Sequence, residues 1–142
     1  MLQSEKLFGM KFILSIMIII SSLHSTDLNW LHSYEKAMTQ AKKEHKDVYL
    51  FIGADRCKFC AKFKATTLAN QDVITRLKKD YVLVYLSRDQ HTIPKGFKTT
   101  GVPRHYFLTS KEELIHDTWG GREVSGFYDV LDEAELNRDD FK

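Results

Sequence analysis

The chain of 142 residues is poor in several residue types, and each shortage excludes a class of protein. Its two cysteines are too few for the disulfide framework of a small secreted scaffold. Neither sign of charge dominates, because 21 Lys and Arg residues are balanced by 19 Asp and Glu residues. There is also no long basic block, which argues against nucleic-acid binding. Without repeats or low-complexity segments, the sequence is that of one globular domain.

An apolar run near the N-terminus, residues 12–20, is too short to span a bilayer, which takes about 20 residues. Lys6 and Lys11 precede it, as in the positively charged flank of a secretory signal peptide. We therefore expect residues 1–25 to be a signal peptide and residues 26–142 to be the exported domain. An uncleaved membrane tether and a buried core helix are the alternatives.

The remaining chain alternates between two kinds of hydrophobic pattern. Apolar residues recur at helical spacing in four segments, residues 30–46, 61–68, 73–79 and 124–136. Strands are expected over residues 48–52, 81–86, 104–108 and 114–119. The first two strands are continuous apolar runs typical of buried strands, and the last alternates like an edge strand. Helices between strands imply parallel pairing, and the short link before the last strand implies an antiparallel hairpin, so the fold class is α/β.

The only cysteines, Cys57 and Cys60, directly follow the first predicted strand. A helix beginning at Cys57 would place the first sulfur beside unpaired backbone N–H groups, which stabilise a thiolate. Since the thiolate is the form that attacks disulfides, the pair points to thiol–disulfide exchange. The spacing alone also fits a zinc site, a structural disulfide or a pair of inert thiols.

A buried strand, a C-x-x-C pair at a helix start and a later Gly-Val-Pro before a strand together resemble the thioredoxin fold. The resemblance covers residues 28–137 and is closest to the bacterial periplasmic thioredoxin-like proteins. It implies a thioredoxin fold with a central mixed sheet of four to five strands flanked by helices. It also implies a thiol–disulfide oxidoreductase without a cofactor or metal, located in the periplasm.

The resemblance assigns roles to four residues. Cys57 corresponds to the nucleophile that forms a mixed disulfide with the substrate, and Cys60 to the thiol that resolves it. Pro103 corresponds to the family's cis-proline, which exposes the backbone of Val102. An extended substrate segment could pair there as an added strand.

The residues around the cysteines depart from the thioredoxin pattern. Arg56 replaces a tryptophan, Lys58 and Phe59 replace Gly-Pro, and Phe51 occupies the place of a buried acid. Arg56 and Lys58 are predicted to tune the redox pair by favouring the Cys57 thiolate, which makes the disulfide more oxidising. Phe59 is similar to the aromatic residue of disulfide isomerases. The two cations thus favour an oxidase, whereas the aromatic residue favours a reductase or isomerase. Of these activities, the reducing or isomerising one is preferred.

The expected partners are cysteine-containing protein substrates and a membrane redox partner that regenerates the active form. No dimerisation segment is visible, so we expect a monomer. One alternative is a copper or zinc module that uses both cysteines and His105, although His105 is expected to face outward from its strand. The other alternative is a non-catalytic thioredoxin-fold adaptor.

Overall fold

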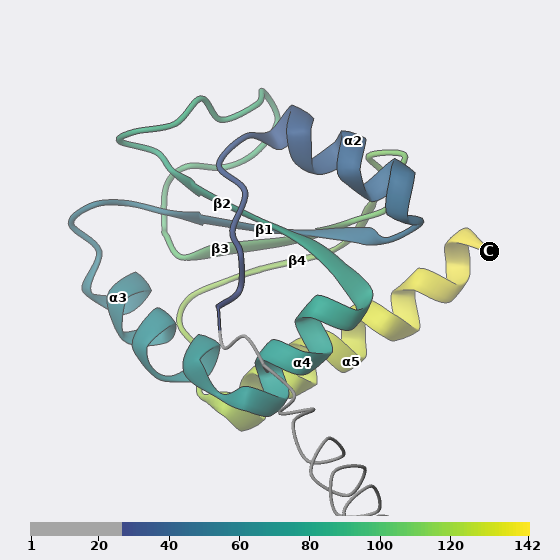
Figure 1. Cartoon of the computed structure of the whole chain (residues 1–142). Helices are drawn as coiled ribbons and strands as arrows, with labels where there is room; N and C mark the ends of the chain where they lie inside the picture. The colour runs from purple at the N-terminus through teal and green to yellow at the C-terminus, as the bar shows by residue number, and fades with distance from the viewer. Residues whose placement is uncertain (1–26) are drawn as a thin grey trace, which may run out of the picture.

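The computed structural model describes residues 27–142, and the predicted signal peptide lies outside the described residues. Four strands form one mixed sheet in the order β2-β1-β3-β4 (Figure 1). The strands are β1 (Asp47–Gly53), β2 (Tyr81–Ser87), β3 (Arg104–Leu108) and β4 (Leu114–Trp119). β1 and β2 run parallel, whereas β1 pairs antiparallel with β3 and β3 antiparallel with β4. The expected α/β fold with a central mixed sheet is confirmed, and the sheet has four of the four to five strands expected.

The helices cover both faces of this sheet (Figure 1). They are α2 (Tyr34–Glu44), α3 (Lys58–Ala65), α4 (Gln71–Asp80) and α5 (Val124–Arg138), with short 3-10 turns at Thr67–Ala69 and Asp139–Phe141. On one face, α2 packs against Val48, Leu50 and Ile52 of β1. On the other, α3, α4 and α5 pack against Tyr49 and Phe51 of the same strand. Because both faces are covered, every residue of β1 is buried.

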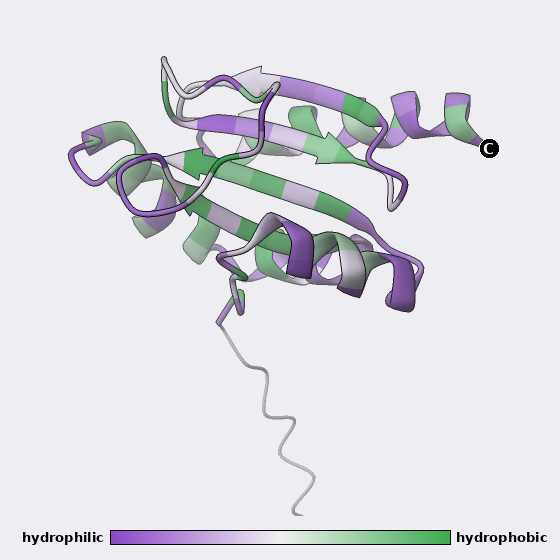
Figure 2. Cartoon of the chain, turned by 90° about the horizontal axis from the view of Figure 1, so that it is seen from above, coloured by the Kyte–Doolittle hydropathy of each residue, from purple (hydrophilic) through white to green (hydrophobic). Residues whose placement is uncertain are grey.

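The edge of the sheet has a different composition from its centre. β4 alternates between a buried Ile115 and exposed or half-exposed residues, as expected for an edge strand. In Figure 2 one outer strand is largely hydrophilic, the strand beside it changes from hydrophilic to hydrophobic along its length, and the remaining strands are mainly hydrophobic. Among residues 27–142, no helix is both long and apolar enough to cross a membrane.

The first helix begins later than its periodicity predicted. α2 starts at Tyr34, because the hydroxyl of Ser33 accepts the backbone N–H of Lys36 and caps the helix there. Before the helix, Leu31 forms a parallel bridge with Val84 on the outer edge of β2. The apolar residue Trp30, which the sequence placed in the helix, instead packs on the rings of Tyr49 and Phe51.

Candidate active site around Cys57 and Cys60

The cysteine pair lies at the carboxyl end of the central strand β1, where the chain turns into α3. Cys57 is the N-cap of this helix, and its sulfur accepts the backbone N–H of Cys60 at 3.1 Å. The two residues form a disulfide, with Cys60 buried and Cys57 half-buried. The more accessible sulfur is therefore the one at the helix N-terminus, where the helix dipole favours negative charge.

The loop before β3 lies against the first cysteine. The sulfur of Cys57 is 3.9 Å from the carbonyl oxygen of Val102, although the two residues are 45 positions apart in sequence. The peptide bond between Val102 and Pro103 is cis, and Pro103 is buried. The fold thus brings together four of the residues singled out from the sequence: Cys57, Cys60, Val102 and Pro103.

The three residues expected to tune the redox pair surround Cys57 at the surface. Arg56, Lys58 and Phe59 are all exposed, and 58% of the Phe59 surface is accessible. The ammonium of Lys58 lies 5.2 Å from the centre of the Phe59 ring. Both cationic side chains are therefore free to approach a charged group outside the protein, and Phe59 offers an apolar surface next to them.

Phe51 occupies the position of the buried acid of thioredoxins, and its neighbours are aromatic rings. Phe51 is buried, and its neighbours in the sheet are Tyr85 on one side and His105 on the other. The ammonium of Lys64 lies 3.5 Å from the centre of the Tyr85 ring, a cation–π contact. Lys64 thus packs over this aromatic group. No carboxylate stands at position 51 to accept a proton from Cys60.

His105 was expected to face outward, and this prediction is wrong. The side chain is completely buried, because β3 lies inside the sheet and the α3–α5 layer covers the face to which His105 belongs. Its Nε2 lies 2.9 Å from the carbonyl oxygen of Gly120, and its Nδ1 lies 2.8 Å from the hydroxyl of Tyr49. Burial lowers the pKa of His105 to about 4, although its bond to Gly120 opposes the shift.

The bonds of His105 continue to the proline loop. The backbone N–H of Gly120 donates to the carbonyl oxygen of Pro103 at 2.8 Å. Gly120 has a φ of +90°, a conformation that glycine adopts most readily. Tyr49, His105 and Gly120 therefore form one hydrogen-bonded connection to Pro103, the residue that follows Val102. Sequence reasoning missed this connection, and the position of His105 two residues after Pro103 was its only signal.

A second group missed from the sequence holds the turn before Cys57. The Asp55 carboxylate accepts hydrogen bonds from the amide of Gln90 at 2.9 Å and the hydroxyl of Ser87 at 2.7 Å. These bonds hold the pKa of Asp55 below its usual range. In turn, the backbone N–H of Asp55 donates to the Asp89 carboxylate at 2.8 Å. The loop after β2 thereby fixes the turn that leads into α3.

The metal-binding alternative finds little support in this arrangement. Within residues 27–142, no group of three or more His, Cys, Asp or Glu residues is placed to hold a metal ion. Both ring nitrogens of His105 are already hydrogen-bonded inside the core. To bind a metal ion together with the two sulfurs, His105 would have to give up one of these hydrogen bonds.

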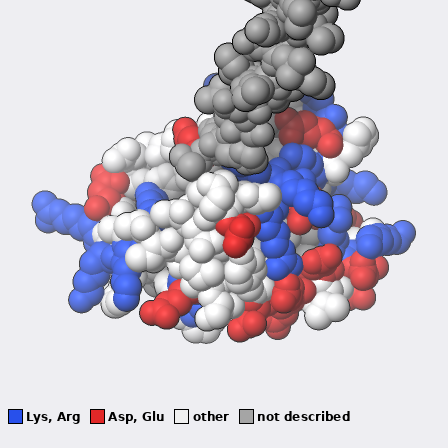
Figure 3. Space-filling model, turned by 60° about the horizontal axis from the view of Figure 1, so that its bottom comes forward, with Lys and Arg blue, Asp and Glu red and all other residues white. Residues whose placement is uncertain are grey.

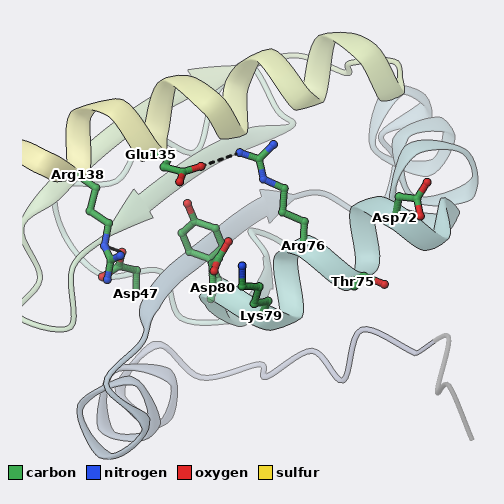
Figure 4. A pocket seen from close by; sticks show the side chains of 9 residues that line it. Asp47, Asp72, Thr75, Arg76, Lys79, Asp80, Glu135 and Arg138 are labelled. Atoms are coloured by element: carbon green, nitrogen blue, oxygen red, sulfur yellow. Dashed lines mark hydrogen bonds and ion pairs between the residues drawn. The ribbon is translucent and has the colours of Figure 1, made fainter. Parts of the chain in front are cut away.

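A charged cavity of about 380 Å³ lies at the opposite end of the sheet, between α4 and α5 (Figure 4). Two of its cationic residues, Arg76 and Arg138, form ion pairs. Arg76 contacts the carboxylates of Asp132 at 2.6 Å and Glu135 at 3.1 Å, and Arg138 pairs with the buried Asp47. These ion pairs join the C-terminal helix α5 to α4 and to the start of β1, which indicates a structural role.

Comparisons of sequence find distant relatives of this chain. A protein of Archaeoglobus fulgidus is 23% identical over 101 residues, which are 70% of this chain and 78% of that protein. A protein of Borreliella burgdorferi is 25% identical over 123 residues, which are 82% of this chain and 53% of that protein. The chain thus spans about half the length of the second relative.

Solved structures share the fold at low sequence identity. The DsbH oxidoreductase superposes with a TM-score of 0.62 at 20% identity, over 78% of this chain and 86% of that one. The C-terminal domain of DsbD from Neisseria meningitidis, in its oxidised form, has a TM-score of 0.60 at 20% identity, over 74% and 98% of the two chains. A family model described as thioredoxin-like matches residues 29–110. With its thioredoxin-like fold and a disulfide-forming cysteine pair at the start of α3, the chain belongs to this thioredoxin-like family.

Proposed function

We propose that this protein is an extracytoplasmic thiol–disulfide oxidoreductase that exchanges disulfides with cysteine-containing protein substrates. The observation that carries the proposal is the Cys57–Cys60 disulfide at the start of α3, with the Cys57 sulfur facing the Val102 backbone. A purely structural disulfide would gain little by lying at a helix terminus, half-exposed, and closing so short a loop. The position instead suits a sulfur that a substrate must reach.

Reduction of a substrate by this pair takes two exchanges. The Cys57 thiolate attacks a sulfur of the substrate disulfide, so that a mixed disulfide forms and the second substrate sulfur leaves as a thiolate and takes up a proton from water. Cys60 then loses its proton, and its thiolate attacks the Cys57 sulfur. The mixed disulfide breaks, the Cys57–Cys60 disulfide forms and the substrate leaves with two thiols. Because Phe51 replaces the acid, water is the acceptor for the Cys60 proton.

Val102 would hold the substrate during these steps. A polypeptide that pairs with its backbone in extended form brings its cysteine to the nearby Cys57 sulfur. Such pairing recognises the main chain and not a particular sequence, so the same site can serve several substrates.

We place the activity in the reducing or isomerising direction, in the periplasm, with the protein acting as a monomer. The exposed Phe59 supports this direction. Arg56 and Lys58 oppose it, because they stabilise the Cys57 thiolate and with it the reduced form of the pair, but we give them less weight. A periplasmic reductant needs a membrane redox partner to return electrons to Cys57 and Cys60. A measured reduction potential of about −270 mV would support a reductant, and one of about −120 mV would make it an oxidant.

Trapping of substrates tests the function directly. A Cys60→Ala variant, expressed as the full chain in a bacterial host, should accumulate mixed disulfides through Cys57 that non-reducing gels detect and thiols release. The matched control is the double variant Cys57→Ala/Cys60→Ala, which should trap nothing. Absence of any thiol-sensitive adduct with Cys60→Ala would overturn the proposal.

A further inference from the structure

A groove of about 750 Å³ opens beside the accessible cysteine. It is bounded by three segments that are distant in sequence: the turn and first residues of α3, the residue after β2, and the loop before Pro103. The lining residues are Asp55, Arg56, Cys57, Lys58, Phe59, Ala61, Arg88, Gly101 and Val102. A substrate that reaches the Cys57 sulfur through this groove therefore contacts all three segments.

The groove carries an excess of positive charge. Arg56, Lys58 and Arg88 line it, and none of them takes part in an ion pair within residues 27–142. Asp55 is the one carboxylate among the lining residues, and both of its oxygens accept hydrogen bonds from Ser87 or Gln90. The groove thus has three cationic side chains and a single carboxylate, and that carboxylate is already hydrogen-bonded. Figure 3 shows Lys and Arg side chains projecting at the end of the molecule that carries α3, the left of the view.

Arg88 is held in place at the groove although its side chain is exposed. Its backbone N–H donates to the carbonyl oxygen of Gly53 at 3.0 Å, and its guanidinium donates to the carbonyl oxygen of Thr99 at 2.8 Å. A guanidinium has five N–H donors, so others remain for an incoming anion. Because the side chain is already oriented, binding a carboxylate there costs less conformational entropy than binding to a free arginine.

We propose that this groove selects substrates whose cysteine is flanked by acidic residues, an extended polypeptide segment with Asp or Glu beside the reacting disulfide. The proposal rests on the proposed exchange function and names its substrate class. Charge complementarity carries it: the carboxylates would face Arg56, Lys58 and Arg88 while the main chain lies along Val102. Such attraction accelerates the encounter more than it tightens the complex, and it weakens as salt is added.

The experiment compares three peptides of equal length, each with one internal disulfide flanked by Glu, Gln or Lys. Stopped-flow measurement gives the second-order rate at which each peptide oxidises the reduced protein. The Glu peptide should react on the order of tenfold faster than the Lys peptide at low ionic strength, with a much smaller ratio in about 0.5 M salt. The neutral compound hydroxyethyl disulfide gives the reference rate, since it has no charge to be selected.

Charge variants locate the effect. The triple variant Arg56→Gln/Lys58→Gln/Arg88→Gln should bring the ratio of Glu-peptide to Lys-peptide rates close to one. Its control, Lys36→Gln/Lys42→Gln/Lys43→Gln, removes three exposed charges from α2 and should keep the ratio. The ratio is the readout, because Arg56 and Lys58 also affect the reactivity of Cys57 toward every disulfide. If circular dichroism shows that the triple variant is unfolded, the single variant Arg88→Gln should lower the ratio by itself.

The outcomes separate the two proposals. Equal rates for the three peptides with the unaltered protein would overturn acidic selection, and so would a ratio that survives the loss of the groove cations. In both cases exchange itself would still occur. Failure of every disulfide to react, hydroxyethyl disulfide included, would instead overturn the exchange function.

Discussion

The hydroxyl of Tyr49 donates a hydrogen bond of 2.8 Å to Nδ1 of His105 in the centre of the core. The other ring nitrogen, Nε2, faces the carbonyl oxygen of Gly120, which can only accept. Nε2 therefore carries the proton of the neutral ring, and Nδ1 offers the lone pair that Tyr49 uses. A second proton on His105 would remove this acceptor from the Tyr49 hydroxyl, in a place with no solvent to replace it.

His105 should make stability depend on pH. Its pKa is about 4 in the folded protein and about 6.5 in an unfolded chain, so between these values the unfolded state binds more protons. The free energy of unfolding should therefore fall as the pH is lowered, by about 3 kcal/mol between pH 7 and pH 4. Urea unfolding at several pH values measures this slope.

Two variants identify the group responsible for this slope. His105→Leu should be less stable at pH 7 but should lack the part of the slope between pH 6.5 and pH 4. His45→Asn alters an exposed histidine and should keep the full slope. If His105→Leu unfolds with the same pH dependence as the unaltered protein, the titration belongs to another residue.

Gly120 should be sensitive to a single methyl group. Its φ of +90° is unfavourable for alanine, and its two backbone groups bond Pro103 and His105. Gly120→Ala should lower the free energy of unfolding by about 1–2 kcal/mol and slow exchange at Cys57. Gly126→Ala, within helix α5, is the matched control and should raise stability by about 0.5–1 kcal/mol. Equal effects of the two changes in denaturant unfolding would show that Gly120 has no special role.

Lys58 should increase the reactivity of Cys57 through its charge. In a Cys60→Ala background, Lys58→Gln should lower the rate of Cys57 alkylation at pH 7 on the order of twofold, since the thiolate is the reactive form. Lys62→Gln removes an equally exposed charge one turn further along α3 and should have a smaller effect. Added salt should reduce the difference. A rate unaffected by Lys58→Gln would remove this residue from the tuning of the redox pair.

The ion pair between Arg138 and Asp47 should stabilise the docking of α5 (Figure 4). Burial raises the pKa of Asp47, and Arg138 opposes that shift. Arg138→Leu leaves the buried carboxylate without its cation, which should cost about 1–2 kcal/mol at pH 7, since Arg138 itself is partly exposed. The loss should shrink as the pH is lowered and Asp47 becomes protonated, since its pKa is raised.

The control for this pair lies a few residues further on. Lys142→Leu breaks the exposed pair with Asp139 and should change stability by less than about 0.5 kcal/mol. Thermal or urea unfolding at pH 7 and pH 4 compares the two variants. An effect of Arg138→Leu that is equal at both pH values would mean that the lost contact is one of packing and not of charge.

Local sequence patterns predicted most of the elements because their causes are local. The continuous apolar runs became β1 and β2, which are buried at every position except the partly exposed Tyr85. The start of α2 was misplaced because Trp30 fits helical spacing equally well. Only the cap at Ser33 and the bridge between Leu31 and Val84 decide where that helix begins.

By itself, the sequence determined the cysteine pair, the strand that precedes it and the helix that begins at it, since these depend on neighbouring residues. Only the tertiary structure decided which distant residues surround Cys57: Val102 at 3.9 Å and Arg88 across the groove. It also decided that His105 is buried, because the sheet order places β3 inside and the helices of the α3–α5 layer cover that face. Burial depends on what packs over a residue, and a single polar side chain in a strand does not reveal this.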